Sequence, residues 1–177
     1  MILRRWRVSD RAPFALINAD SAVMQFFPSA LTAEESGSML ARIEAHFEEH
    51  GFGLWAAELR TTGEFIGFVG LSIPRFKAAF TPCVEIGWRL SRRYWHLGLA
   101  TEGAREVVRC AFEDLGLPSL VSFTAAGNLP SRRVMEKLGM SHDPRENFGH
   151  PSLAEGHPLR LHVLYRLDCS DWKQRGE

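Results

Sequence analysis

The sequence predicts a mixed α/β domain whose first strands are antiparallel. Two extended segments, 54–59 and 65–73, are joined by residues 61–64, which are typical of a hairpin turn. The predicted elements follow the order β-α-α-β-β-β-α-β-α-β. That order contains too few alternating strand and helix units for a doubly wound parallel sheet.

The first half of the chain is predicted to place two helices between its first strand and the hairpin. Residues 2–6 form the first strand and residues 10–19 a short helix. A second helix follows Thr32, because Thr32 and Glu35 have the spacing of a capping box, and it ends at Gly51. Its apolar residues recur at helical spacing: Met39, Leu40, Ile43 and Phe47.

The second half is predicted to alternate strands with helices. The expected elements are a strand over 84–90, a helix over 101–115, a strand over 120–124, a helix over 131–138 and a strand over 162–167. The helix over 101–115 is clearly amphipathic, and Gly116 and Pro118 end it. In the strand over 84–90, side chains alternate, so that Glu85 and Arg89 lie on the face opposite Ile86.

Composition indicates one globular domain. The chain has 177 residues, 45% hydrophobic and 24% charged, and its 21 basic and 21 acidic residues leave no net charge. We expect a single domain over 1–170 and a short tail over 171–177. Proteins that bind bulk nucleic acid or anionic membranes need a basic excess, so neither partner is expected.

Cysteine and histidine spacing gives no metal or disulfide pattern. Cys83, Cys110 and Cys169 are odd in number and far apart. The histidines at 142, 150, 157 and 162 match no standard ligand spacing, so no metal is expected. Residues 1–13 lack the apolar core of a signal peptide, and the longest apolar run, 65–73, is half of the ~18 residues of a membrane span. We therefore expect a cytoplasmic protein.

Residues 85–102 predict an anion site. A strand leads through small residues, Gly98 and Ala100, into a helix beginning near Thr101. Such a turn collects backbone N–H groups at the positive end of a helix, where a phosphate or pyrophosphate binds. The alternative is an ordinary turn beside two solvated arginines, Arg92 and Arg93. Neither a P-loop lysine nor a glycine-spaced dinucleotide fingerprint is present.

Two motifs resemble those of the GNAT superfamily of N-acetyltransferases, closest to the ribosomal-protein N-terminal acetyltransferases of the RimJ and RimL type. The first comprises Glu85-Ile86-Gly87-Trp88 and the run from Tyr94 to Glu102, YWHLGLATE. The second is NLPSRRVMEKLGM, from Asn128 to Met140. Residues 55–71 and 157–167 also resemble that branch, so the resemblance covers nearly the whole chain.

The resemblance implies an acyl-CoA N-acyltransferase fold, a mixed, mostly antiparallel sheet with splayed central parallel strands and flanking helices. It implies acetyl-CoA as cosubstrate, with pantetheine on the backbone of one strand, pyrophosphate on the following loop, and Asn128 and Ser131 near the acyl end. The predicted cofactor-binding residues are Trp88, Arg89, Leu90, Trp95, His96, Leu97, Gly98, Leu99, Ala100, Thr101, Asn128 and Ser131.

The loop departs from the family pattern at three positions. Trp95 replaces the usual Gln or Arg, His96 a common Gly, and Leu97 a frequent polar residue. A side chain at 96 fits only if its φ is negative or the left-handed region is tolerated there. Weaker CoA binding than in relatives is therefore one expectation.

Glu85 and Ser131 are the predicted catalytic residues. Glu85 accepts the proton of the substrate amine, unless it is a structural partner of an arginine or a water chain serves instead. The resemblance implies a Tyr acid seven residues after Asn128, but that position is Met135. Ser131 can donate near the departing thiolate, or alternatively cap its helix.

The expected function is acetyl transfer to a primary amine, either a protein N-terminus or a small molecule, by a monomer or homodimer. The alternatives are transfer of another acyl group, or a catalytically weak CoA-binding sensor or interaction module. Loops around Phe26 and Phe27, residues 76–81 and residues 142–157 are expected to select the acceptor, with Phe76 and Phe80 as candidate pocket walls.

Overall fold

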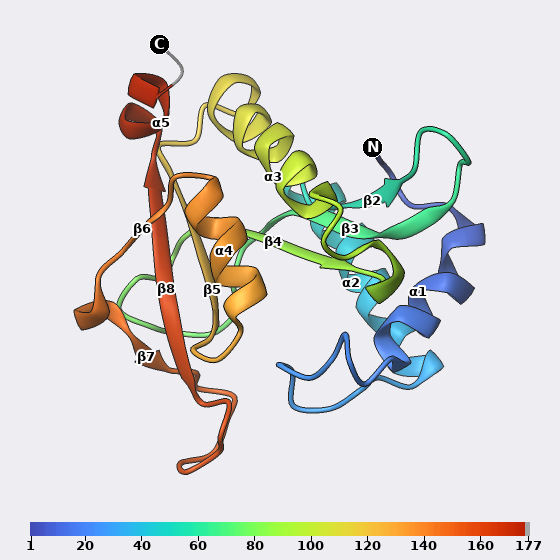
Figure 1. Ribbon diagram of the computed structural model, residues 1–177, viewed down its shortest axis with the longest axis horizontal. Coiled ribbons are helices and arrows are strands. Elements are labelled where there is room, and N and C mark those ends of the chain that lie inside the picture. The colour runs from blue at the N-terminus through green and yellow to red at the C-terminus, as the bar shows by residue number, and fades with distance from the viewer. Residues whose placement is uncertain (176–177) are drawn as a thin grey trace. The chain divides into compact units, whose positions relative to one another are not determined.

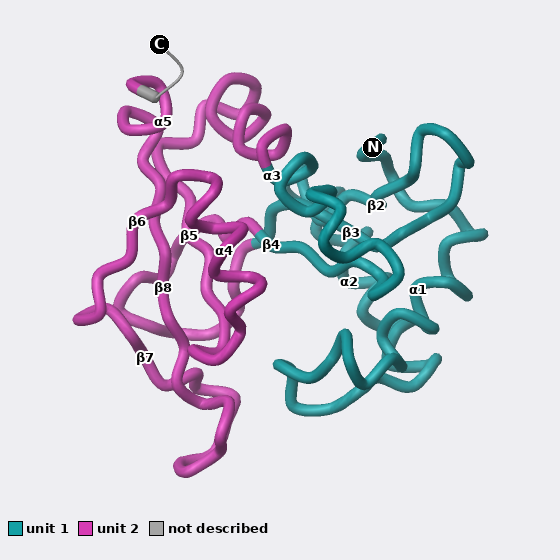
Figure 2. Tube along the Cα trace, viewed as in Figure 1, with its two compact units in different colours: residues 1–72, 87–104 teal, residues 73–86, 105–177 magenta. Residues whose placement is uncertain are grey.

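The computed structural model describes residues 1–175, which divide into two compact units (Figure 2). Unit 1 comprises Met1–Ser72 and Gly87–Ala104. Unit 2 comprises Ile73–Ile86 and the chain from Arg105 onward. Two elements run through both units, strand β4 (Glu85–Leu90) and helix α3 (Leu99–Arg109).

Unit 1 is an antiparallel sheet with two helices (Figure 1). Its other elements are β1 (Ile2–Arg4), α1 (Arg11–Ala19), α2 (Ala33–His50), β2 (Leu54–Glu58), β3 (Phe65–Ser72) and the short 3₁₀ turns Val8–Asp10 and Arg92–Tyr94. Strand β2 pairs with β1 and β3, and Ala57 lies opposite both Leu3 and Gly67. Gly67 has φ 137°, and a Cβ there would lie 2.1 Å from the Arg89 carbonyl oxygen, so only glycine allows this close approach of β4.

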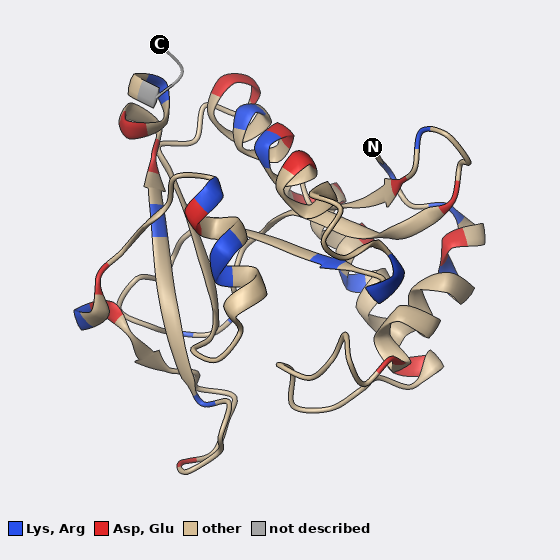
Figure 3. Cartoon of the chain, viewed as in Figure 1, with Lys and Arg blue, Asp and Glu red and all other residues tan. Residues whose placement is uncertain are grey.

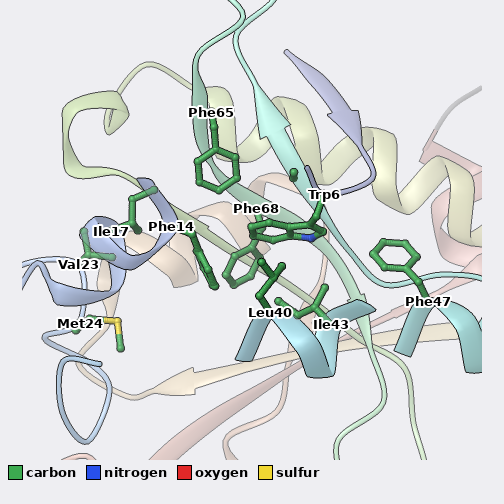
Figure 4. Close-up of a cluster of buried hydrophobic side chains, with 11 residues drawn as sticks. Trp6, Phe14, Ile17, Val23, Met24, Leu40, Ile43, Phe47, Phe65 and Phe68 are labelled. Atoms are coloured by element: carbon green, nitrogen blue, oxygen red, sulfur yellow. The ribbon is translucent and has the colours of Figure 1, made fainter. Parts of the chain in front are cut away.

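The core of unit 1 is aromatic (Figure 4). The Trp6 indole lies 4.9 Å from the Phe14 ring, edge to face, and its Nε1 donates to the Leu54 carbonyl at 2.6 Å. Leu40 and Ile43 of α2 point into the same cluster. The helical spacing of apolar residues in α2 therefore serves to cover this aromatic cluster.

Unit 2 is built around the long strand β8 (Leu161–Asp168). Its other elements are β5 (Ser119–Ala125), α4 (Leu129–Lys137), β6 (Ser141–His142), β7 (Phe148–Gly149), α5 (Cys169–Arg175), the π turn Cys110–Asp114 and the 3₁₀ turn Pro144–Glu146. Strand β8 is antiparallel to β5 from Ser119↔Asp168 to Ala125↔His162, and it also pairs with β6 and β7.

The parallel pairing of β4 with β5 is short. Glu85 pairs with Val121, and the Val121 N–H donates to the Val84 carbonyl at 2.9 Å. At the next position the Ser122 hydroxyl, a side-chain donor, donates to the Ile86 carbonyl at 2.9 Å. A side chain therefore replaces the backbone ladder at Ile86, where splayed strands are expected to separate.

The mixed, mostly antiparallel sheet with flanking helices is confirmed, and the principal strands and helices lie where the sequence predicts them. Three elements were not predicted: β6, β7 and α5. Residues 171–175, expected in a tail, lie within α5, whose Trp172 packs against Phe112 at 5.4 Å, whereas residues 176–177 lie outside the described residues. Within the described part of the chain, no helix has the length and apolar character needed to cross a membrane.

Candidate functional site

The loop between β4 and α3 has two residues with left-handed backbone conformation, both in unit 1. His96 has φ 62° and Gly98 has φ 79°. Of the two conformations open to a side chain at 96, the structure therefore has the left-handed one. That conformation is strained for a non-glycine residue, by about 1–2 kcal/mol. The His96 side chain is exposed, so its φ is set by the course of the loop backbone and not by packing of the side chain.

This loop presents a row of backbone donors. The first hydrogen bond of α3 runs from the Glu102 N–H to the Gly98 carbonyl at 3.0 Å. Among residues 1–175, no oxygen accepts a hydrogen bond from any N–H of His96 to Thr101. Unpaired donors at the positive end of an eleven-residue helix form a site for an anion.

Trp95 anchors the loop. Its indole Nε1 donates to the Leu90 carbonyl at 2.9 Å, and its ring packs against the aromatic core of unit 1. The Trp95 side chain is thus turned toward β4. Only the Trp95 backbone is left for the predicted contact with the cofactor. Leu97, by contrast, is 65% exposed.

Basic side chains add little to the field of the loop. Figure 3 shows Lys and Arg on the turn that follows β4. Arg92 and Arg93 are exposed, and Arg93 lies 3.7 Å from a Glu64 oxygen. Exposed charges are screened, so backbone N–H groups supply most of the positive potential there.

In unit 2, Asn128 caps helix α4. Its Oδ1 accepts from the Ser131 N–H at 3.3 Å, and its Nδ2 donates to the Thr124 hydroxyl at 2.9 Å. The alternative role of Ser131 as the helix cap is therefore wrong, since Asn128 holds that position. Within the described residues the half-buried Ser131 hydroxyl donates to no protein acceptor.

Glu85 lies where the parallel pairing of β4 and β5 ends. It is half-buried opposite Val121. Its charge acts on Cys83, because burial, and then Glu85, raise the pKa of the Cys83 thiol to about 11. Asn128 follows the far end of β5, about 13 Å along the strand from Val121. Glu85 of β4 therefore lies beside the first half of β5, whereas Ser131 belongs to α4, the helix that follows the end of β5.

No phenol occupies the position that the family uses for its acid. Met135 stands there, 1% exposed within unit 2. The Tyr165 hydroxyl donates to Glu136 at 3.1 Å and accepts from the Arg132 Nε at 3.3 Å, while its ring stacks on His142. Tyr165 is thus committed to holding α4 against β8.

An aromatic cluster on unit 2 was only partly foreseen. Its members are half-buried, apart from the buried His162, and comprise Phe76, Phe80, Phe123, Phe148, His150 and His162. The two imidazoles lie 4.9 Å apart, and burial lowers the pKa of each. The sequence pointed to Phe76, Phe80 and His150, but the three strands that add Phe123, Phe148 and His162, namely β5, β7 and β8, become neighbours only in the fold.

Comparison with known proteins defines the class. Residues 1–141 match the acetyltransferase (GNAT) domain family. An Aspergillus fumigatus protein, FsC-acetyl coenzyme A-N(2)-transacetylase, is 42% identical over 96 residues, which are 52% of this chain and 40% of that protein. This chain therefore aligns with less than half of that relative's length.

Solved structures share the fold. A GNAT-family acetyltransferase from Bacillus anthracis has a TM-score of 0.77 at 21% identity, covering 95% of this chain and 94% of that one. Mycobacterium smegmatis RimJ, solved with CoA-disulfide, has a TM-score of 0.74 at 18% identity, covering 96% and 82%.

These findings define an α/β N-acetyltransferase domain. The chain belongs to the GNAT acetyltransferase family, whose members use acetyl-CoA.

Proposed function

We propose that this protein transfers the acetyl group of acetyl-CoA directly to a primary amine, on a peptide N-terminus or a small molecule. One observation supports this above the others, the row of N–H groups from His96 to Thr101 that has no acceptor among the described residues. A diphosphate needs several donors and positive potential at one point, which the start of α3 offers. The residues present therefore fit this part of the cofactor.

The cosubstrate supplies an activated thioester, and the protein must accept a proton from the amine. A primary amine is mostly protonated near pH 7, so a base within reach increases the reactive fraction. Glu85 is our proposed base, since its half-buried carboxylate lies where the backbone ladder between β4 and β5 ends.

Ser131 is proposed to donate toward the departing thiolate or the adjacent pantetheine. Two observations support this role. Its N–H is already satisfied by Asn128, and among the described residues its hydroxyl has no protein acceptor. Because Met135 is apolar and buried, no side chain at the usual acid position competes for the role.

The test combines binding with turnover. Calorimetry measures acetyl-CoA affinity, and thiol release is followed with amines and N-terminal peptides. Glu85→Gln is expected to lower turnover about 10²- to 10⁴-fold without changing acetyl-CoA affinity. Glu44→Gln, on the exposed face of α2, is the matched control and leaves turnover unchanged.

Each result has a distinct meaning. No detectable acetyl-CoA binding would refute the proposal. Binding without thiol release for any acceptor would favour a CoA sensor. The structural reason is that Met135, which cannot donate a proton, stands at the acid position.

A further inference from the structure

Arg89 is a buried arginine without a counter-ion. It is 8% exposed, and its Nη1 donates to Asn18 Oδ1 at 2.6 Å and contacts Met39 Sδ at 3.8 Å. Its Nε is buried and has no hydrogen-bond partner. Across residues 1–175, no carboxylate forms a salt bridge with it. Burying a charge without a counter-ion costs free energy of folding, so a buried guanidinium without a carboxylate requires an explanation.

Arg4, in the same unit, shows the usual arrangement. Its guanidinium donates to both Asp10 oxygens, at 2.7 and 2.9 Å, and to Glu58 at 2.6 Å. Its side chain is 12% exposed, comparable to that of Arg89. Unit 1 therefore supplies two carboxylates to one arginine and none to the other.

The Arg89 guanidinium lies over two phenylalanine rings, one buried and one partly exposed. The Phe68 ring, in the core, lies 5.5 Å away, whereas the Phe27 ring lies 4.2 Å away and Phe27 is 39% exposed. Phe27 belongs to residues 20–32, a segment without helix or strand. A half-exposed ring on such a segment can move with little loss of packing.

Two buried polar side chains, Asn18 and Ser36, hold the guanidinium in place beside the Phe27 ring. Asn18 is fully buried, and its Nδ2 donates to the Ser36 hydroxyl at 3.2 Å, with Ser36 1% exposed. Asn18 thus uses both ends of its amide inside an apolar core. Buried polar groups of this kind restrict orientation, and they leave the Nε edge of Arg89 as the unused donor.

We propose that Arg89 binds a carboxylate of the amine acceptor, so that the substrate is an amino acid or a similar amine that bears an acid group. A carboxylate accepts two parallel N–H bonds from a guanidinium, and Nε is one of the two donors that this geometry uses. Binding displaces the Phe27 ring. The inference rests on the proposed acetyl transfer and names its substrate class.

The location of Arg89 agrees with this role. Its backbone lies in the segment Trp88–Leu90, which the family resemblance assigns to pantetheine, so the guanidinium is one side-chain length from the cofactor strand. Phe27 lies in one of the loops from which the sequence predicts acceptor selection. Both features support a position of the charge beside the proposed site of the acetyl donor.

The experiment measures acetylation of the twenty amino acids and of their carboxamides. The amide has the less basic amine, so intrinsic reactivity favours it. We expect the wild-type protein nonetheless to have a KM about 10- to 100-fold lower for its preferred acid than for the matched amide. Arg89→Met brings that ratio close to one with the KM for acetyl-CoA unchanged, and Arg89→Lys retains part of it.

Arg5→Met is the matched control, because Arg5 also lies over an aromatic ring, at 4.4 Å from Phe47, but is exposed and paired with Glu48. It leaves the ratio of acid to amide unchanged. A wild-type ratio near one, or an unchanged ratio in Arg89→Met, overturns the inference while acetyl transfer stands. Acetyl-CoA binding with no pair acetylated also overturns it, and absence of binding refutes the proposed function as well. If Arg89→Met does not fold, the inference is tested by the ratio of KM values for amide and acid in the wild-type protein and in Arg89→Lys.

Discussion

Replacing Arg89 and Arg4 of unit 1 by methionine should have different consequences for the free energy of unfolding. Burial lowers the pKa of Arg89 to about 10. Each pKa unit corresponds to about 1.4 kcal/mol, so the buried charge costs folding about 3 kcal/mol near neutral pH. This cost is present below pH 10 and diminishes as pH rises through that value, because the folded protein then loses the proton first.

Arg89→Met removes this cost but also removes favourable contacts. The Asn18 oxygen loses its donor, worth about 1–3 kcal/mol, and two cation–π contacts worth about 0.5–1 kcal/mol each disappear. The opposing terms nearly cancel, so we expect stability within about 1 kcal/mol of wild type. Arg4→Met, in contrast, leaves the buried Asp10 without its ion-pair partner and Glu58 paired with Arg7 alone, and should cost about 3–5 kcal/mol.

Urea unfolding followed by circular dichroism compares the two variants. A change in midpoint at constant slope reports stability alone. If Arg89→Met lost 3 kcal/mol or more, Arg89 would be a structural residue like Arg4, and the reasoning that assigns it to a ligand would be refuted.

Three further predictions concern the loop and Glu85. His96→Gly relieves the strained φ of 62° and should stabilise the protein by about 1 kcal/mol while acetyl-CoA affinity stays equal or improves. Gly98→Ala, at φ 79°, should destabilise it by about 1–2 kcal/mol and weaken acetyl-CoA binding in calorimetry, whereas Gly37→Ala, inside α2 with open space around its Cβ, should stabilise it by about 0.5–1 kcal/mol. Glu85→Gln should lower the raised pKa of the Cys83 thiol, because a negative charge is removed, and should speed its alkylation at pH 8 as mapped by mass spectrometry.

Specific outcomes would contradict these expectations. Loss of acetyl-CoA binding in His96→Gly would show that the imidazole itself contacts the ligand. Equal thermal stability of Gly98→Ala and wild type would show that the loop does not need its left-handed conformation. An unchanged alkylation rate at Cys83 would mean that Glu85 is not charged in the resting protein.

The sequence predicted the larger elements because their side-chain periodicity is local. Apolar spacing and the Thr32 capping box give α2, and alternation gives β4. Strands β6 and β7 have two residues each, too few to show any period. They exist because β8 offers backbone partners along the edge that β5 does not occupy.

The candidate site was predicted unevenly for a similar reason. The loop from His96 to Thr101 could be found from glycine, small residues and a helix start, all adjacent in the chain. The choice between the two conformations of His96 could not, since the anchoring of Trp95 to Leu90 and the aromatic core helps set the backbone path.

Sequence alone determined the class of fold, the motifs and the loop that offers donors to an anion, because each depends on neighbours within a few residues. Only the tertiary structure revealed that Arg89 is buried without a carboxylate. Alternation along β4 separates Arg89 from Ile86 but does not show what covers either face. Asn18 of α1, 71 residues away in the chain, and Phe27 of the segment that follows α1 reach the guanidinium, and Ser36 of α2 holds Asn18. Burial and charge pairing depend on such long-range contacts, and the chemistry proposed for the acceptor depends on them too.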